Sequence, residues 1–292
     1  MHDSDSRLCK TSVGQIAPVR ATGDLTDFII DDFIHGGYGS TYGVTPQERS
    51  DLVSAFRRNV SKIKAATSAV AHAVLAREIL EIPADVEGSI IECGVWNGAS
   101  TASLSLVCQR VGRRLWVCDS FEGLPDDETR LHMGLHFGNY GYYKKGMFCG
   151  PLEQVQRNLY HYGSLESCDF IQGFFSESLK ALGGPIVFAF LDVDLVGSTH
   201  DCLRAIWPLL IEDGRIYSDD AGDLDVVRVF FDDPWWETHL GCRSPGFVGS
   251  GCGLPFNAKQ SPLGYARKVT KFDPEKFHRS AHLWYPDTDR RE

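Results

Sequence analysis

Residues 89–100 read SIIECGVWNGAS, and this stretch decides the fold. A short apolar run ends at Glu92, two glycines follow at Gly94 and Gly98, and a helical pattern opens at Ala99. A strand that turns through glycines into a helix is typical of a βαβ unit. The glycines let the backbone turn tightly and approach a ligand, and Ser100 can cap the helix or donate a hydrogen bond. The spacing is not GxGxxG, so a dinucleotide is a poor fit.

Apolar runs and amphipathic segments alternate along the rest of the chain. Further strands are expected at 114–120, 168–173, 185–193 and 215–220. Helices are expected at 99–110, 151–162, 176–182, 199–211 and 223–231. This alternation predicts an α/β fold with a doubly wound, Rossmann-like, mostly parallel sheet. The closing stretches GYARKVTKF and AHLWYP can add one or two strands.

The flanking segments suggest a division of the chain into three parts. Residues 1–22 are polar and unpatterned, which predicts a disordered tail. Residues 23–83 are expected to form a loop, at 28–43, followed by helices that act as a lid or in oligomerisation. Residues 84–292 then form the main domain.

Two long stretches interrupt the alternation of strands and helices. They are residues 121–150 and an extended loop at about 232–264 that is rich in Trp, Gly and Cys. Long irregular loops in compact domains are usually lids or binding loops. Trp235 and Trp236 can shape an acceptor pocket or pack at a subunit interface, and the sequence favours neither.

Composition excludes several classes of partner. The formal net charge of −10, without clustered Lys and Arg, argues against nucleic acid. No apolar run approaches the ~20 residues of a membrane span, and the polar opening MHDSDSRLCK does not resemble a signal peptide. The nine cysteines are scattered, odd in number and form no CxxC pair of the kind that suggests zinc or redox chemistry, and we expect most of them to be small core residues in a reducing compartment. We therefore expect a soluble, cytoplasmic protein.

A second acidic strand end lies in CDSFEGLP, where Asp119 follows Glu92 by 27 residues. An acidic group there can accept hydrogen bonds from ribose hydroxyls. The alternative is structural: Gly94 and Gly98 make only a tight turn, and Asp119 caps a loop.

These motifs occur together with GFF at 173–175, LDVDLVGST at 191–199 and an aspartate pair at 219–220. In this combination, residues 45–230 resemble the TylF/MycF-like (macrocin) O-methyltransferases, which are class I S-adenosylmethionine-dependent enzymes that use magnesium. The resemblance implies cofactor-binding residues in the glycine turn and at two further strand ends. These are Glu92, Gly94 and Gly98 at the methionine end, Trp96 and Ser100 in the same turn, Asp119 at the ribose, Ser120 and Phe121 at the nucleoside, and Gly173 and Phe174 at the adenine.

The acidic strand ends predict a metal site. If strands 185–193 and 214–220 are neighbours, their carboxyl ends lie about 5 Å apart. Carboxylates that converge at that distance disfavour joint ionisation unless a cation neutralises them. An all-oxygen ligand set favours Mg²⁺, and we expect Asp192, Asp219 and Asp220 to be the ligands. Strand alternation can turn Asp194 away, and helix capping is the structural alternative for these aspartates.

Methyl transfer to a hydroxyl also needs a base. His132 and His136, in the loop after DSFEGLP, have a suitable pKa range, and Asp192 is a further candidate. Either histidine can equally be a surface residue.

We therefore expect a magnesium-dependent O-methyltransferase that acts on a small molecule, by resemblance a sugar or polyketide-like natural product, and that forms a homo-oligomer. A metal-dependent hydrolase or a non-catalytic cofactor-binding protein are the alternatives. The family commonly carries D-x-D-x-Y-x-S-T, but this chain has Val196 and Gly197 at the aromatic place and after it. The expected metal ligands are retained, whereas the change leaves undetermined which residues near Val196 contact the substrate.

Overall fold

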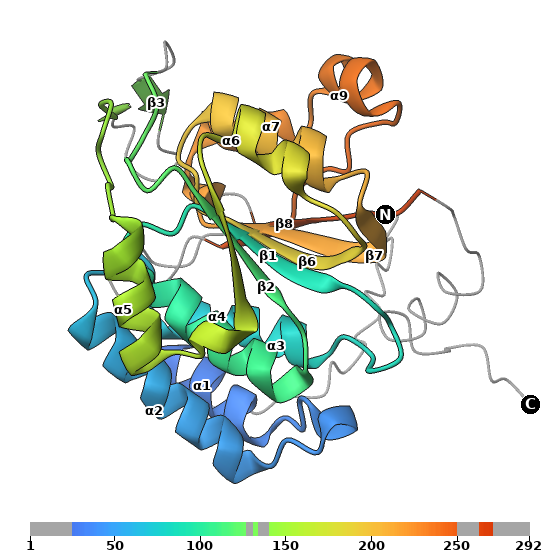
Figure 1. Ribbon diagram of the computed structural model, residues 1–292. Coiled ribbons are helices and arrows are strands. Elements are labelled where there is room, and N and C mark those ends of the chain that lie inside the picture. Colours follow the sequence, from blue (N-terminus) through green and yellow to red (C-terminus); the bar gives the residue numbers. More distant parts are fainter. Residues whose placement is uncertain (1–24, 127–130, 134–139, 250–262, 271–292) are drawn as a thin grey trace, which may run out of the picture.

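A six-stranded sheet organises the protein (Figure 1). The computed structural model describes residues 25–126, 131–133, 140–249 and 263–270. The strand order is β5-β2-β1-β6-β7-β8, with β8 antiparallel and the other strands parallel. The strands are β1 (Ser89–Cys93), β2 (Leu115–Asp119), β5 (Cys168–Gln172), β6 (Ile186–Leu191), β7 (Leu210–Ser218) and β8 (Gly264–Arg267). The predicted doubly wound, mostly parallel sheet is confirmed.

The strand order places a switch point at the centre of the sheet. From β1 the chain moves outward through β2 to β5, then returns to add β6 on the other side of β1 and continues to β7. In open sheets of this kind, ligands bind beyond the carboxyl ends of the strands where the order reverses. The ends of β1 and β6 are therefore the expected location of a site.

Helices cover both faces of the sheet (Figure 1). One face carries α1 (Leu25–His35), α2 (Pro46–Lys62), α3 (Ala69–Leu80), α4 (Ala99–Val111) and α5 (Leu152–Tyr162). The other carries α6 (Phe175–Ser178), α7 (Val196–Ile206), α8 (Leu224–Val229) and α9 (Asp233–Leu240). Strand alternation divides the core accordingly: Ile90 packs in the cluster under α1–α5, and Ile91 packs in the cluster under α7 and α8.

The N-terminal helices belong to this core. Helix α2 begins as expected, because Thr45 and Glu48 form a capping box and Pro46 occupies the first turn. Phe33 of α1 and Phe56 of α2 are fully buried, with ring centroids 6.2 Å apart. The prediction of a loop from residue 28 was wrong for its first part, since α1 runs to His35. Its apolar residues pack on α2 and α3, a tertiary stabilisation that local patterning did not reveal. The roles in a lid or in oligomerisation stay predictions.

Several boundaries also differ from expectation. Strand β7 begins at Leu210, so the helix expected at 199–211 ends at Ile206 instead. The loop expected at 232–264 contains α9, whose first turn is capped by Asp232 and has a proline near its start. A short hairpin of β3 (Leu131–Met133) and β4 (Tyr140–Tyr142) lies in the stretch read as irregular. The tail 1–22 and residues 281–286 lie outside the described residues.

Among the helices that the structure describes, none has the length and apolar character that crossing a bilayer demands.

Candidate active site

The turn between β1 and α4 forms the floor of the site. Gly94 has φ +84°, and a Cβ there would lie 1.8 Å from the backbone oxygen of Asp192. Only glycine therefore lets the ends of β1 and β6 come this close. Gly98 is left-handed at the start of α4, and Trp96 adopts φ 45°, which is uncommon for a bulky residue. Such conformations are concentrated at functional sites.

Glu92 lies buried beneath this turn. Ser100 Oγ donates a hydrogen bond to Glu92 Oε1 at 2.5 Å, whereas Oε2 is buried and has no partner among the described residues. Burial raises the pKa of Glu92 to about 7. The pair fits a role behind the turn, with one oxygen left to interact with a ligand or water.

Asp119 holds two loops together. Its Oδ2 accepts hydrogen bonds from the backbone nitrogens of Val95 (2.6 Å) and Trp96 (3.3 Å), and its Oδ1 accepts one from Phe121 N (2.7 Å). The structural reading of Asp119 thus has direct support. Asp119 also lines the adjoining cavity, so the expected ribose contact stays a prediction.

A cavity of about 830 Å³, counted with its open mouth, lies over the glycine turn. Among the expected cofactor residues, it is lined by Gly94, Trp96, Asp119, Ser120 and Phe174. Glu92, Gly98, Ser100, Phe121 and Gly173 do not line it.

Other lining residues were missed by sequence reasoning. They include Ala66, Phe148, Ser176, Ser198 and Asp201. Phe148 has φ 57° and packs edge-on against Trp96, with ring centroids 5.5 Å apart. Ser198 lies within the LDVDLVGST motif, which could have indicated it, although it was not named as a site residue. No sequence motif marks Ala66, Phe148 or Asp201, because they approach the cavity only through the packing of distant segments.

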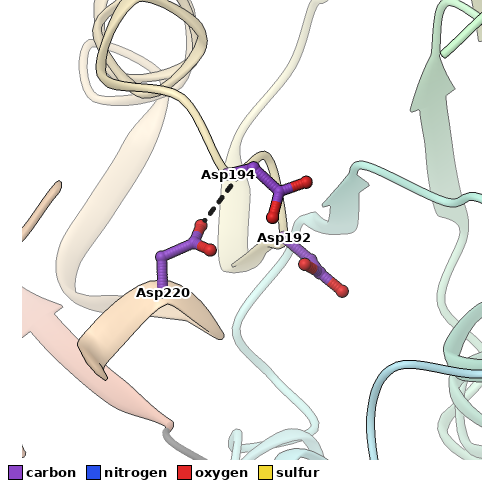
Figure 2. A group of neighbouring side chains, drawn as sticks. All are labelled: Asp192, Asp194 and Asp220. Atoms are coloured by element: carbon purple, nitrogen blue, oxygen red, sulfur yellow. Dashed lines mark hydrogen bonds between the residues drawn. The ribbon is translucent and has the colours of Figure 1, made fainter. Parts of the chain in front are cut away.

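Three carboxylates meet beside the cavity, where β6 and β7 end (Figure 2). Asp192, Asp194 and Asp220 each offer an oxygen, and these oxygens all lie within 4.8 Å of one another. Asp220 Oδ2 accepts hydrogen bonds from the backbone nitrogens of Asp194 (3.2 Å) and Val193 (3.4 Å). We call these three residues the acidic cluster. The expected pairing of β6 with β7, which brings them together, is confirmed.

Electrostatics of the acidic cluster suit a cation. Burial, and next the charges of Asp219 and Asp194, raise the pKa of Asp192 well above its usual value. Burial, and next the charges of Asp194 and Asp219, do the same for Asp220. A hard divalent ion would relieve this repulsion, and an all-carboxylate set fits Mg²⁺ better than a soft metal.

The structure groups Asp194, rather than the expected Asp219, with Asp192 and Asp220, and the identity of the metal ligands stays a prediction. Strand β6 ends at Leu191, so strand alternation no longer applies at Asp194, whose φ of 60° lets it join the acidic cluster. Asp219 contributes its charge nearby but is not one of the three, and its backbone nitrogen bonds Leu191 O at 2.9 Å. Tyr143 lies near Asp194: burial, and next the charges of Asp194 and Asp220, raise the pKa of its hydroxyl well above the usual value.

The candidate bases cannot be placed at the acidic cluster. His132 lies in β3, but only its backbone is described, and His136 lies outside the described residues. Asp192 is the one candidate base in the described cluster, so the assignment of the histidines stays a prediction.

Comparison with known proteins identifies relatives of the chain. The sequence profile of the macrocin-O-methyltransferase (TylF) family matches residues 72–239. The chain is 37% identical over 153 residues to the 8-demethyl-8-(2,3-dimethoxy-alpha-L-rhamnosyl)-tetracenomycin-C 4'-O-methyltransferase of Streptomyces olivaceus, an alignment that covers 49% of this chain and 56% of the relative. It is 30% identical over 143 residues to the mycinamicin III 3''-O-methyltransferase of Micromonospora griseorubida, covering 46% and 56% of the two chains. The chain thus spans about half the length of these relatives.

A solved structure supports the fold. The O-methyltransferase NovP superposes with a TM-score of 0.50 at 18% identity, over 75% of this chain and 97% of that one. At this identity the likeness concerns the fold alone.

Proposed function

The chain belongs to the macrocin-O-methyltransferase (TylF) family, and from this premise we propose that it transfers a methyl group from S-adenosylmethionine to a hydroxyl of a small molecule, with Mg²⁺ at the acidic cluster. The family match confirms the resemblance that the sequence motifs indicated. One observation carries the proposal: Asp192 and Asp194 of the acidic cluster line the same cavity as the glycine turn. A donor in that cavity and a cation at the cluster would be neighbours.

The residues of the cavity fit the cofactor by position and chemistry. S-adenosylmethionine, when bound, supplies an electrophilic methyl group. The glycine turn admits the methionyl end close to the backbone, and the unpartnered Glu92 Oε2 lies behind it. Phe174, which is 41% exposed and lines the cavity, offers a ring face for the adenine.

The acidic cluster would hold the cation through Asp192, Asp194 and Asp220, with Asp219 adding negative charge. Mg²⁺, when bound, lowers the pKa of a coordinated hydroxyl and orients it. The backbone bonds from Val193 and Asp194 to Asp220 keep that carboxylate in position before a ligand arrives. A carboxylate of the cluster, or one of the two predicted histidines, would accept the proton.

The acceptor class follows from the relatives. The Streptomyces relative is named for a rhamnosyl tetracenomycin, and the Micromonospora relative for mycinamicin III. We propose a hydroxyl of a sugar or polyketide-like natural product for this chain. A cytoplasmic location and self-association stay predictions of the sequence.

Transfer of a labelled methyl group from S-adenosylmethionine to the acceptors named for the relatives tests this function. We expect labelled product with Mg²⁺, none with excess chelator, and recovery when Mg²⁺ is restored. Asp220→Asn should lower the rate by roughly 10- to 100-fold or more, on the order of the effect expected when a metal ligand or its support is lost. Asp169→Asn, on exposed β5 surface paired with Arg114, is the matched control and should retain activity.

Calorimetry separates the alternatives. A metal-dependent hydrolase predicts no binding of S-adenosylmethionine, and a non-catalytic protein predicts binding without transfer to any acceptor. Full activity of Asp220→Asn, or of the wild type in excess chelator, would contradict the role of the cation.

A further inference from the structure

The charge of the cavity leaves one part of the cofactor unmatched. Every ionisable side chain among its described lining residues is acidic, namely Asp119, Asp192, Asp194 and Asp201. S-adenosylmethionine carries positive sulfonium and amino groups, which suit this lining, and a methionyl carboxylate, which does not. A positive side chain at the rim, beside the glycine turn, would offset the repulsion.

Lys64 lies at that rim. Its Nζ is 5.0 Å from the centroid of the Trp96 ring, over the ring face, and Trp96 lines the cavity. The lysine is exposed, and Ala66, two residues further along, lines the cavity itself. A cation held on an aromatic face keeps its charge available to a second, anionic partner.

The segment that carries Lys64 is anchored on both sides. Ile63 is 3% exposed in the core, and Thr67 is buried with its hydroxyl 2.8 Å from His72 Nε2. These anchors fix the short connection between α2 and α3 against the cavity mouth. Since Lys64 itself is exposed, its ammonium group is not committed to packing in the core.

We propose that Lys64 binds the methionyl carboxylate of S-adenosylmethionine, with the Trp96 ring as the platform that holds the ammonium group at the rim. This inference rests on the proposed function, because it assumes that the cavity takes this cofactor. It adds a binding residue outside the strand-end motifs, contributed by the N-terminal helical segment. That segment would thereby take part directly in the site.

Decarboxylated S-adenosylmethionine, which lacks only this carboxylate, provides the test by calorimetry. Lys64→Met should weaken binding of S-adenosylmethionine about tenfold, the order expected for a charged hydrogen bond, and leave the decarboxylated analogue unchanged. Lys64→Arg, which retains the charge, should largely restore the preference for the carboxylate. Lys62→Met, exposed at the end of α2, is the matched control and should behave like the wild type.

The outcomes distinguish this inference from the proposed function. A wild-type protein that binds neither compound contradicts the proposed function, whatever Lys64 does. Suppose that the wild type binds S-adenosylmethionine, but Lys64→Met weakens the binding of both compounds equally or changes the binding of neither. The role proposed for Lys64 is then wrong, while the proposed function stands. Thermal melting of each variant verifies that the fold is intact.

Discussion

At the scale of single residues, buried carboxylates distinguish this site from an ordinary strand-to-helix turn. Glu92 illustrates the point, because it is fully buried, holds Ser100 through one oxygen and has its other oxygen unpartnered. A group in this state has a high pKa, and its ionisation opposes folding. An ionised Glu92 in this position therefore destabilises the fold.

The raised pKa of Glu92 predicts a pH dependence of folding. Its value is about 7 in the folded protein, against 4.5 ordinarily. The neutral Glu92 carboxyl contributes fully to the free energy of unfolding below pH 4.5. This contribution is lost as the pH rises to about 7, because Glu92 ionises at a lower pH in the unfolded chain than in the folded protein. Glu92→Gln should remove on the order of 3 kcal/mol from the change in the free energy of unfolding over this pH range, because a pKa difference of one unit corresponds to about 1.36 kcal/mol.

Chemical denaturation of the cofactor-free protein at a series of pH values measures this effect. Asp192 and Asp220 contribute with the same sign in both proteins, and the charge of Glu92 also raises the pKa of Asp192, so the difference reports Glu92 together with its coupling to Asp192. Glu87→Gln, at an exposed position before β1, is the control. Parallel profiles for the wild type and Glu92→Gln would refute the assignment.

Residue types at strand ends were predictable from the sequence, but their exact partners were not. The convergence of Asp192 with Asp220 followed from two strands expected to be neighbours, and β6 and β7 are neighbours. The inclusion of Asp194 depended on where β6 ends and on a left-handed φ of 60°. Such a local conformation arises from tertiary packing and has no reliable sequence signal.

At the scale of elements, the β1–α4 turn and the end of β6 form one unit. The expected strand–glycine–helix pattern is present, with β1 ending at Cys93 and α4 beginning at Ala99. What the pattern could not reveal is the contact between Gly94 and the backbone of Asp192, since these residues are remote in sequence. Helix α1 was missed for the same reason, because its apolar residues gain stability only by packing on α2 and α3.

Two glycine substitutions measure this contact. Gly94→Ala combines a φ of +84° with a Cβ 1.8 Å from a backbone oxygen, so it should destabilise the fold by roughly 3 kcal/mol or more. Gly112→Ala, at the end of α4, has a φ of +68° and no heavy atom within 4 Å, so only the conformational cost of about 1–2 kcal/mol applies.

Denaturation and cofactor titration of both variants give the comparison. Gly94→Ala should also lose affinity for S-adenosylmethionine, whereas Gly112→Ala should retain it. Equal destabilisation by the two substitutions, with cofactor binding intact in both, would show that the close approach at Gly94 is unimportant.

At the scale of the whole molecule, the sheet topology brings the two halves of the site together. The β1 half supplies the glycine turn and, through its pairing with β2, Asp119, whereas the β6–β7 half supplies the acidic cluster. The switch point between β1 and β6 makes these halves adjacent. The alternation of strands and helices predicted a doubly wound, mostly parallel sheet, but not the strand order that makes these halves adjacent. The contribution of the α2–α3 connection to the cavity was not predictable, because nothing in its composition marks it.

The central claim is that the acidic cluster and the cofactor cavity form a single site. Mn²⁺, as a paramagnetic substitute for Mg²⁺, tests it when ¹³C-methyl S-adenosylmethionine is bound without an acceptor. The methyl carbon should relax faster when Mn²⁺ binds, and this enhancement should disappear in Asp220→Asn. A methyl carbon whose relaxation is unchanged, while calorimetry shows that both Mn²⁺ and the cofactor are bound, would contradict the account.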